Sequence, residues 1–168
     1  QSGAFGTHLL ALTARRGISV GVWLSPGNEA DVSVADGISF LADDPDTKVI
    51  TLMGEGVRRP QEFMAVAEQA LKKNKPILVV KLGRSEMGKR QAISHTGSLA
   101  GADEVFDAVC HRLGLIRVPT LEDLTEMTLA FMPGRFPRGS RAAIVVNSGG
   151  MKGLLCDHWD ELKSNLAQ

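Results

Sequence analysis

The stretch KVITLMGEGVRRPQEFMAVAEQALKKNKPILVVKL (residues 48–82) decides the fold. Its two ends, 48–53 and 76–82, are short and almost wholly apolar, which is typical of strands buried on both faces. Between them, residues 60–73 carry apolar side chains at helical spacing, and Pro60 suits the first turn of a helix. This order predicts two parallel strands joined by a crossover helix.

The same alternation continues on both sides of this unit. Helical spacing predicts further helices, and short apolar runs predict further strands. Thr120, followed three residues later by Asp123, has the pattern of a helix N-cap. The predicted helices are 4–15, 32–42, one beginning near 102, and 121–131, and the predicted strands are 19–24 and 115–118. Together they predict an α/β domain with a parallel sheet covered by helices on both faces.

Both ends of this domain have a distinctive sequence. MPGRFPRGS (132–140) is rich in Pro and Gly and is typical of a linker. Residues 141–168 then repeat the order strand, glycine turn, helix, and we expect them to begin a second similar domain. QSGAFG (1–6) is a small-residue turn that opens a helix, like NSGGMKG (147–153), but no strand precedes it. We therefore expect the first strand of the domain to be missing.

Composition excludes several classes of protein. The 168 residues are 43% hydrophobic and 23% charged, which is the profile of a globular domain. Nineteen basic side chains balance nineteen acidic ones, so the excess of positive charge that nucleic-acid binding needs is absent. No apolar run is long enough to span a membrane, and the N-terminus lacks the features of a signal peptide. Two cysteines without CxxC spacing favour the cytosol, so we expect a cytoplasmic protein without a membrane partner.

Two segments could bind or orient a phosphoryl group. Ser2 and Gly3 open the first predicted helix, where free backbone N–H groups and the helix dipole favour an anion. The alternative is a plain Ser N-cap with Gly allowing close packing. Glu55 lies between two glycines at the carboxyl end of a strand, where open parallel sheets bind their ligands. The alternative there is a solvated acidic residue in a turn.

Residues 83–101 show no periodicity, and we expect a long irregular loop, a feature that is often functional. The loop carries His95 among small residues, and Gly97 allows a phosphate to approach closely. A neutral imidazole is a competent nucleophile near pH 7. The alternative is an ordinary surface histidine. Basic residues upstream that could favour anions are Lys81, Arg84, Lys89 and Arg90.

The remaining histidines, His8, His111 and His158, have no zinc-ligand spacing, so no metal ligand is expected in this chain. Nucleotide fingerprints of the G-x-x-x-x-G-K-[ST] and G-x-G-x-x-G types are absent, and so is a G-x-S-x-G elbow. The NSGG turn at 147–150 could bind an anion but also suits a tight strand-to-helix turn. A His, a carboxylate and a helix N-terminus at one edge of the sheet together predict a histidine that accepts a phosphoryl group.

Five segments resemble the NDP-forming acyl-CoA synthetases, a family that includes ADP-forming acetate–CoA ligases and is related to the succinyl-CoA synthetase α subunit. They are QSGAFG (1–6), PGNEADVSVADGISFLADDPDTKVI (26–50), GEG (54–56), KPILVVKLGRSEMGKRQAISHTGSLAGAD (75–103) and VPTLEDL (118–124). The resemblance covers nearly the whole chain. It implies a flavodoxin-like domain over residues 1–131, with a second such domain beginning after the linker.

The resemblance also implies an activity. Enzymes of this family interconvert acyl-CoA, NDP and phosphate with the free acid, CoA and NTP, through an acyl phosphate and a phosphohistidine. By resemblance, His95 is the nucleophile, Glu55 orients it, and Ser2 and Gly3 hold the phosphoryl group. CoA, ATP or ADP, and Mg²⁺ are the implied cofactors. The CoA-binding and ATP-grasp domains, which would hold them, are the implied partners, within an oligomer.

Two other functions stay open. The chain could be a synthetase-like region that senses acyl-CoA within a regulatory protein, such as a protein acetyltransferase. The presence of both His95 and Glu55 argues against this reading. The chain could also bind a flavin, but it has no Tyr, and its two tryptophans, Trp23 and Trp159, are far apart in sequence.

Overall fold

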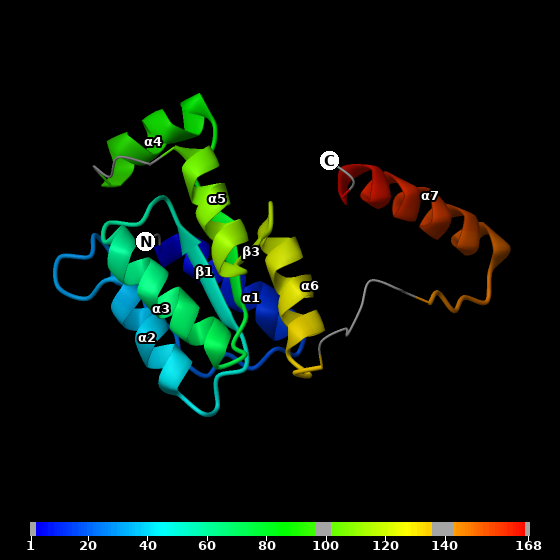
Figure 1. Ribbon diagram of the computed structural model, residues 1–168, viewed down its shortest axis with the longest axis horizontal. Coiled ribbons are helices and arrows are strands. Elements are labelled where there is room, and N and C mark those ends of the chain that lie inside the picture. The colour runs from blue at the N-terminus through cyan, green and yellow to red at the C-terminus, as the bar shows by residue number, and fades with distance from the viewer. Residues whose placement is uncertain (1–2, 97–101, 136–142, 167–168) are drawn as a thin grey trace. The chain divides into compact units, whose positions relative to one another are not determined.

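The computed structural model describes residues 3–96, 102–135 and 143–166, and for 92–96 and 162–166 it describes the backbone alone (Figure 1). The chain divides into two compact units, Gln1–Arg135 and Phe136–Gln168. The first unit contains α1 (Gly3–Arg15), α2 (Val34–Asp43), β1 (Ile50–Gly54), α3 (Pro60–Lys72), β2 (Ile77–Lys81), α4 (Glu86–Thr96), α5 (Asp103–Leu113), β3 (Ile116–Arg117) and α6 (Leu121–Phe131). The second unit contains α7 (Gly149–Leu166).

The sheet of the first unit is parallel, in the order β1-β2-β3. Ile50 pairs with Ile77, and Leu78 pairs with Ile116. Every residue of β2 is buried, as expected for the central strand of a sheet with covered faces. The α/β prediction with a parallel sheet and helices on both faces is thus confirmed.

Two apolar clusters lie on the two faces of the sheet. On one face, α2, α3 and α5 pack around Phe63, Ile50 and Val79. On the other face, α1 and α6 pack around Leu78, Val80 and Leu124. Leu78 and Val79 are neighbours in β2 and belong to different clusters, because successive side chains of a strand point to opposite faces. The core therefore has two layers separated by the sheet.

Local signals explain where several helices begin. Ser33 and Asp36 form a capping box at α2, with Ser33 N–H donating to Asp36 Oδ2 over 2.8 Å. The expected N-cap of α6 is confirmed, since Asp123 N–H donates to Thr120 Oγ1 over 3.0 Å. Pro60 is the first residue of α3, also as expected.

The predicted strand at 19–24 is wrong, because residues 18–26 form neither helix nor strand. The segment has the composition of a strand, but within the described chain it has no neighbour with which to exchange backbone hydrogen bonds. A strand exists only through such pairing.

The second unit differs from its prediction in the same way. Its helix, α7, is present, but residues 143–148 form no strand. An isolated strand is unstable for want of partners, and the described part of this unit offers no other strand. That residues 141–168 begin a second flavodoxin-like domain, and that 132–140 are a linker, remain predictions.

Candidate functional site

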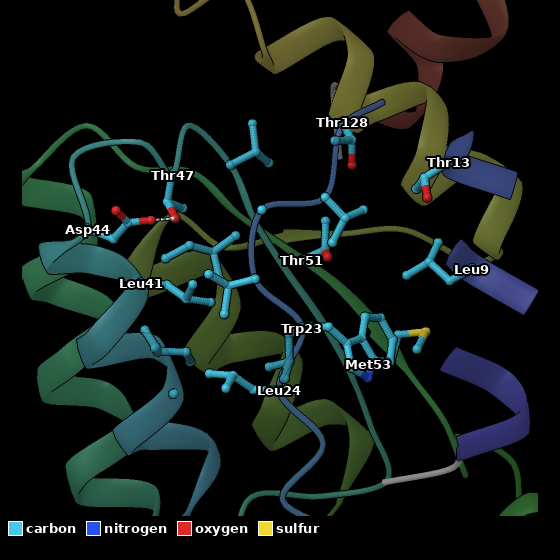
Figure 2. A pocket seen from close by; sticks show the side chains of 18 of the residues that line it. Leu9, Thr13, Trp23, Leu24, Leu41, Asp44, Thr47, Thr51, Met53 and Thr128 are labelled. Carbon is cyan, nitrogen blue, oxygen red and sulfur yellow. Dashed lines mark hydrogen bonds between the residues drawn. The ribbon is translucent and has the colours of Figure 1, made fainter. Parts of the chain in front are cut away.

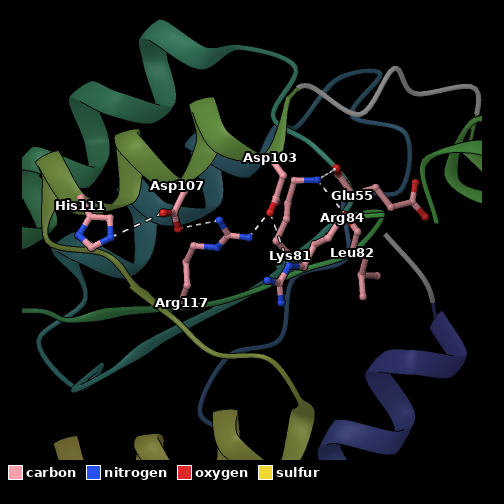
Figure 3. A network of polar contacts seen from close by, with 8 residues as sticks. All are labelled: Glu55, Lys81, Leu82, Arg84, Asp103, Asp107, His111 and Arg117. Atoms are coloured by element: carbon pink, nitrogen blue, oxygen red, sulfur yellow. Dashed lines mark hydrogen bonds and ion pairs between the residues drawn. The ribbon is translucent and has the colours of Figure 1, made fainter. Parts of the chain in front are cut away.

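The carboxyl ends of β1 and β2 place two buried charged residues side by side (Figure 3). Glu55 directly follows β1 and is 7% exposed, and Lys81 is the last residue of β2 and is 6% exposed. Lys81 Nζ donates to the main-chain oxygen of Glu55 over 2.5 Å and to that of Leu82 over 2.8 Å. The ammonium group therefore holds the ends of both strands and the turn that carries Glu55.

The side chain of Lys81 is closely packed. Phe106 of α5 places its ring centroid 5.9 Å from Lys81 Nζ. A void of only about 10 Å³, which Lys81 and Phe106 help to line, remains beside them. Burial lowers the pKa of Lys81 below its ordinary value, while the carboxylate of Asp103 acts in the opposite direction. The site thus contains a buried ammonium group bound by carbonyl dipoles.

A second group of charges continues from Lys81 along α5. Arg117 of β3 donates to Asp103 and to Asp107, each over 2.8 Å, and is only 15% exposed. Its guanidinium carbon lies 5.4 Å from the centroid of Phe106. Arg84 approaches Asp103 at 3.6 Å (Figure 3). These ion pairs connect the N-terminal half of α5 to β3 and to the turn after β2.

The segment that carries His95 is not an irregular loop, so the loop predicted over 83–101 is wrong for 86–96, which form α4. Gly83 adopts φ +66°, a conformation that suits glycine and turns the chain after β2. Ser85 Oγ then accepts a hydrogen bond from Gly88 N–H over 3.1 Å, as an N-cap does. His95 lies in the last turn of α4.

The predicted phosphate-binding residues are described less completely. Gly3 is the first residue of α1, so it stands at a helix N-terminus as expected. In Figures 1 and 3, α1 begins near the carboxyl end of β1, at the edge of the sheet where Glu55 lies. Ser2 and Gly97 lie outside the described residues. The structure therefore brings Glu55 and the start of α1 to one edge of the sheet, and α4 begins shortly after β2 ends at the same edge.

Three of the basic residues upstream of His95 in sequence, Lys81, Arg84 and Lys89, have partners within the chain. Lys81 is buried and donates to two carbonyl oxygens. Arg84 pairs with Asp103, and Lys89 pairs with Glu86 at 2.7 Å. Lys81 is buried, so it stabilises the turn that carries Glu55, whereas the pairs of Arg84 and Lys89 lie at the surface, where ion pairs are weak.

Sequence reasoning missed the part played by Asp103, Asp107, Phe106 and Arg117. A signal was present, since Asp103 and Asp107 are four residues apart on one helix, and Arg117 is a lone charge in the short apolar run 115–118. A charge in such a run needs a buried partner. Two acidic residues on the preceding helix are the obvious candidates.

The described residues contain no cluster of three or more His, Cys, Asp or Glu side chains suited to a metal ion. None of their helices combines the length and the apolar character that crossing a membrane requires.

Several proteins of known function are similar to this chain in sequence. The chain is 39% identical to the α subunit of acetate–CoA ligase [ADP-forming] I of Pyrococcus furiosus, over 96% of this chain and 35% of the relative. It is 38% identical to 4-hydroxybutyrate–CoA ligase [ADP-forming] of Nitrosopumilus maritimus, over 99% of this chain and 24% of the relative. The chain thus spans about a third or less of the length of these curated relatives.

A solved structure shows the same fold. It is the dinucleotide forming acetyl-coenzyme A synthetase 1 of Ca. Korarchaeum cryptofilum in complex with phosphate and ADP, with a TM-score of 0.81 and 36% identity. The match covers 89% of this chain and 32% of that one. The model of the succinyl-CoA ligase like flavodoxin domain matches residues 1–131, the range expected from the sequence. The chain therefore belongs to the family of succinyl-CoA ligase like flavodoxin domains.

Proposed function

We propose that this chain is the phosphohistidine-bearing segment of an ADP-forming acyl-CoA ligase. The observation that carries the proposal is the buried Glu55 at the carboxyl end of β1, beside the start of α1, in a chain that belongs to this family. The names of the relatives support the reaction class, since they are ADP-forming CoA ligases. The acyl group differs between those relatives, so the proposal leaves it open.

Each predicted site residue has a defined role in this reaction. Phosphate displaces CoA from acyl-CoA and gives an acyl phosphate. A ring nitrogen of His95 then attacks the phosphorus atom, the bond from phosphorus to the acyl oxygen breaks, and the carboxylate leaves. Glu55 orients the imidazole and stabilises its positive charge. Ser2 offers its hydroxyl group and Ser2, Gly3 and Gly97 offer backbone N–H groups to the phosphoryl oxygens, which the two glycines allow to approach closely.

The second half of the reaction transfers the phosphoryl group from His95 to ADP, giving ATP. We place the nucleotide, CoA and Mg²⁺ on domains or subunits outside this chain, because the chain spans about a third or less of the length of relatives named as ADP-forming CoA ligases. The partners are therefore a CoA-binding and an ATP-grasp region, in an oligomer. The expected setting is the cytosol, where thiols such as Cys110 and Cys156 stay reduced.

The test uses the full-length protein with ATP and Mg²⁺, analysed by intact mass and peptide mapping under basic conditions. We expect a gain of roughly 80 Da, one phosphoryl group, on the peptide that holds His95. His95→Ala abolishes the gain. His111→Ala is the matched control, because His111 is 84% exposed and lies on α5, and this variant keeps the gain.

Other outcomes would overturn the proposal. If a folded, ATP-binding sample gains no phosphoryl group, the chain is not the phosphohistidine segment, and the acyl-CoA-sensing reading takes its place. If His95→Ala retains acyl-CoA-dependent ATP synthesis, His95 is not the nucleophile. Glu55→Gln tests the second role, and we expect slower phosphorylation with the protein still folded.

A further inference from the structure

The pairing of β1 with β2 ends directly before the two segments that carry the proposed catalytic residues. At its end, Leu82 N–H donates to Gly54 O over 2.8 Å. The chain after Gly54 continues into Glu55, and the chain after Leu82 continues into α4, which contains His95. Strand pairing therefore fixes the two segments only up to Gly54 and Leu82.

The described residues hold β1 in place mainly from the side of β2. On its other side, Thr51 and Met53 line a cavity of about 700 Å³ together with Trp23, and no described strand pairs with β1 there (Figure 2). Within the described chain, the position of the Glu55 turn thus depends on the bonds that reach it from β2.

Lys81 supplies such bonds, one step beyond the end of the strand pairing (Figure 3). Its Nζ donates to the main-chain oxygen of Glu55 over 2.5 Å and to that of Leu82 over 2.8 Å. An ammonium group has three N–H donors, so one cation can bind both oxygens at the same time. Lys81 therefore sets the spacing between the Glu55 turn and the start of the segment that leads to His95.

The ammonium group itself has little room to move. Val79 and Lys81 are two residues apart in β2, so their side chains leave the same face of the sheet, which α5 covers. The ring centroid of Phe106 on α5 lies 5.9 Å from Lys81 Nζ, and the void beside them is only about 10 Å³. Arg117 binds Asp103 and so keeps this part of α5 against the sheet. A confined cation holds its two carbonyl partners at fixed positions.

Packing alone does not require a positive charge at this position. Removing an ammonium group from water is costly, and an apolar side chain of the same length would fill the volume without that cost. An apolar side chain could not donate to the main-chain oxygens of Glu55 and Leu82. These two bonds are therefore what a lysine contributes here.

We propose that Lys81 is a positioning residue for phosphoryl transfer, because it holds the Glu55 turn in register with the start of the His95 segment. This inference rests on the function proposed above. Lys81 acts through Glu55, which has to lie within hydrogen-bond reach of the imidazole that it orients. A misplacement of about 1 Å at such a site can slow the reaction by about 100-fold.

Single-turnover kinetics test this role in the full-length protein. The protein is mixed with ATP and Mg²⁺, the reaction is stopped under basic conditions, and phosphorylation of His95 is measured over time. We expect Lys81→Met to lower the rate at saturating ATP by about 100-fold. The ATP concentration that gives half of the maximal rate should stay the same, because the nucleotide is placed outside this chain. A change in that concentration alone would overturn the proposal.

Ile77→Val is the matched control for a general loss of stability. Ile77 is 4% exposed at the other end of β2, so the substitution removes a buried methyl group and leaves Lys81 and its carbonyl partners in place. We expect this variant to be less stable than the unaltered protein and to keep its rate of phosphorylation. A rate that falls as far as in Lys81→Met would assign the effect to stability and overturn the proposal.

A double-mutant cycle with Glu55→Ala shows whether Lys81 acts through Glu55. Glu55→Ala removes the carboxylate and keeps the main-chain oxygen that Lys81 binds. In this background, Lys81→Met should slow phosphorylation by less than about threefold, because the group that Lys81 positions is gone. The full loss in this background would overturn the proposal. Lys81→Gln, which shortens the side chain by one atom, goes through the same cycle, so the test remains in place if Lys81→Met does not fold.

The unaltered protein distinguishes the failure of this inference from the failure of the proposed function. If it gains no phosphoryl group on His95, the proposed function is wrong, and the role of Lys81 fails with it. If it gains the group and Lys81→Met gains it at the same rate, the proposed function stands and the positioning role of Lys81 is overturned.

Discussion

The carboxyl ends of β1 and β2 and the outer edge of β1 are neighbouring regions with opposite properties. At the carboxyl ends, the buried Lys81 has two carbonyl partners and Arg117 has two carboxylates. At the outer edge, the described residues give β1 no second neighbour, and Trp23 and Leu24 are nearly half exposed. Because an unpartnered buried polar group is costly, the partnered charges make the first region closed and rigid, whereas the second region stays open.

The largest expected effect comes from comparing two aromatic residues, one in each environment. Phe63 is 1% exposed and packs against Phe106 with ring centroids 6.4 Å apart. Phe63→Ala should lower the free energy of unfolding by about 3–5 kcal/mol, because it leaves a cavity in a closed core. Trp23→Ala should cost about 1 kcal/mol in the 168-residue chain, because its surroundings are open. Urea unfolding followed by circular dichroism measures both.

If the two substitutions lower the free energy of unfolding by the same amount, the comparison fails, because Trp23 would then lie in a closed core. We expect the smaller loss of stability for Trp23→Ala, because the indole is 41% exposed whereas Phe63 is 1% exposed.

An intermediate effect is expected at the carboxyl ends. Lys81→Met keeps the length of the side chain but leaves the carbonyl oxygens of Glu55 and Leu82 without their donor. We expect a loss of about 1–3 kcal/mol at pH 7. Lys72→Met, on the exposed side of α3, is the matched control and should change little. Urea unfolding of the three proteins provides the measurement.

The pH dependence of this difference gives a second readout. Burial lowers the pKa of Lys81 below 10.5, so between the lowered pKa and 10.5 the unfolded chain binds more protons than the folded one. The free energy of unfolding therefore rises with pH in that window, and the rise should be absent in Lys81→Met. A wild-type protein whose Lys81-dependent stability falls over the same window would contradict the burial of the ammonium group.

The smallest expected effect concerns the contact between α1 and Trp23. A Cβ added at Gly6 would lie 2.2 Å from Cζ2 of Trp23, so the indole has to move in Gly6→Ala. In the 168-residue chain the half-exposed ring can turn away, and alanine favours the helix by about 1 kcal/mol, so we expect little net change in the melting temperature. Ala14→Gly, at an exposed position of α1, calibrates the propensity of the same helix. A large loss in the short chain would mean that Trp23 is already fixed.

Periodicity predicted most of the fold because the period of apolar side chains reflects which face is buried. The apolar strands β1 and β2, and the helices α1, α2, α3, α5 and α6, were each expected from this signal. Periodicity did not predict α4, because this helix has no apolar face. Its first turns consist of the charged residues Glu86, Lys89 and Arg90, together with Gly88 and with Met87, which is 77% exposed. Its available signals were Ser85 as a cap and the i,i+3 pair of Glu86 with Lys89.

The sequence also indicated Glu55, because an acid between glycines after an apolar strand lies at the edge where such sheets bind ligands. It did not indicate that Lys81 would be buried against the main chain of that same turn. This contact joins residues 26 positions apart, and it depends on the register of β1 and β2.

By itself, then, the sequence determined the α/β class, the order of most elements and the place of Glu55, since local periodicity and turn residues carry that information. Only the tertiary structure decided which charges have partners and, among the described residues, which strand edges have no neighbouring strand. Hydrogen bonding between segments depends on which segments lie side by side in the fold. The residues of a segment such as 19–25 do not by themselves specify that neighbour.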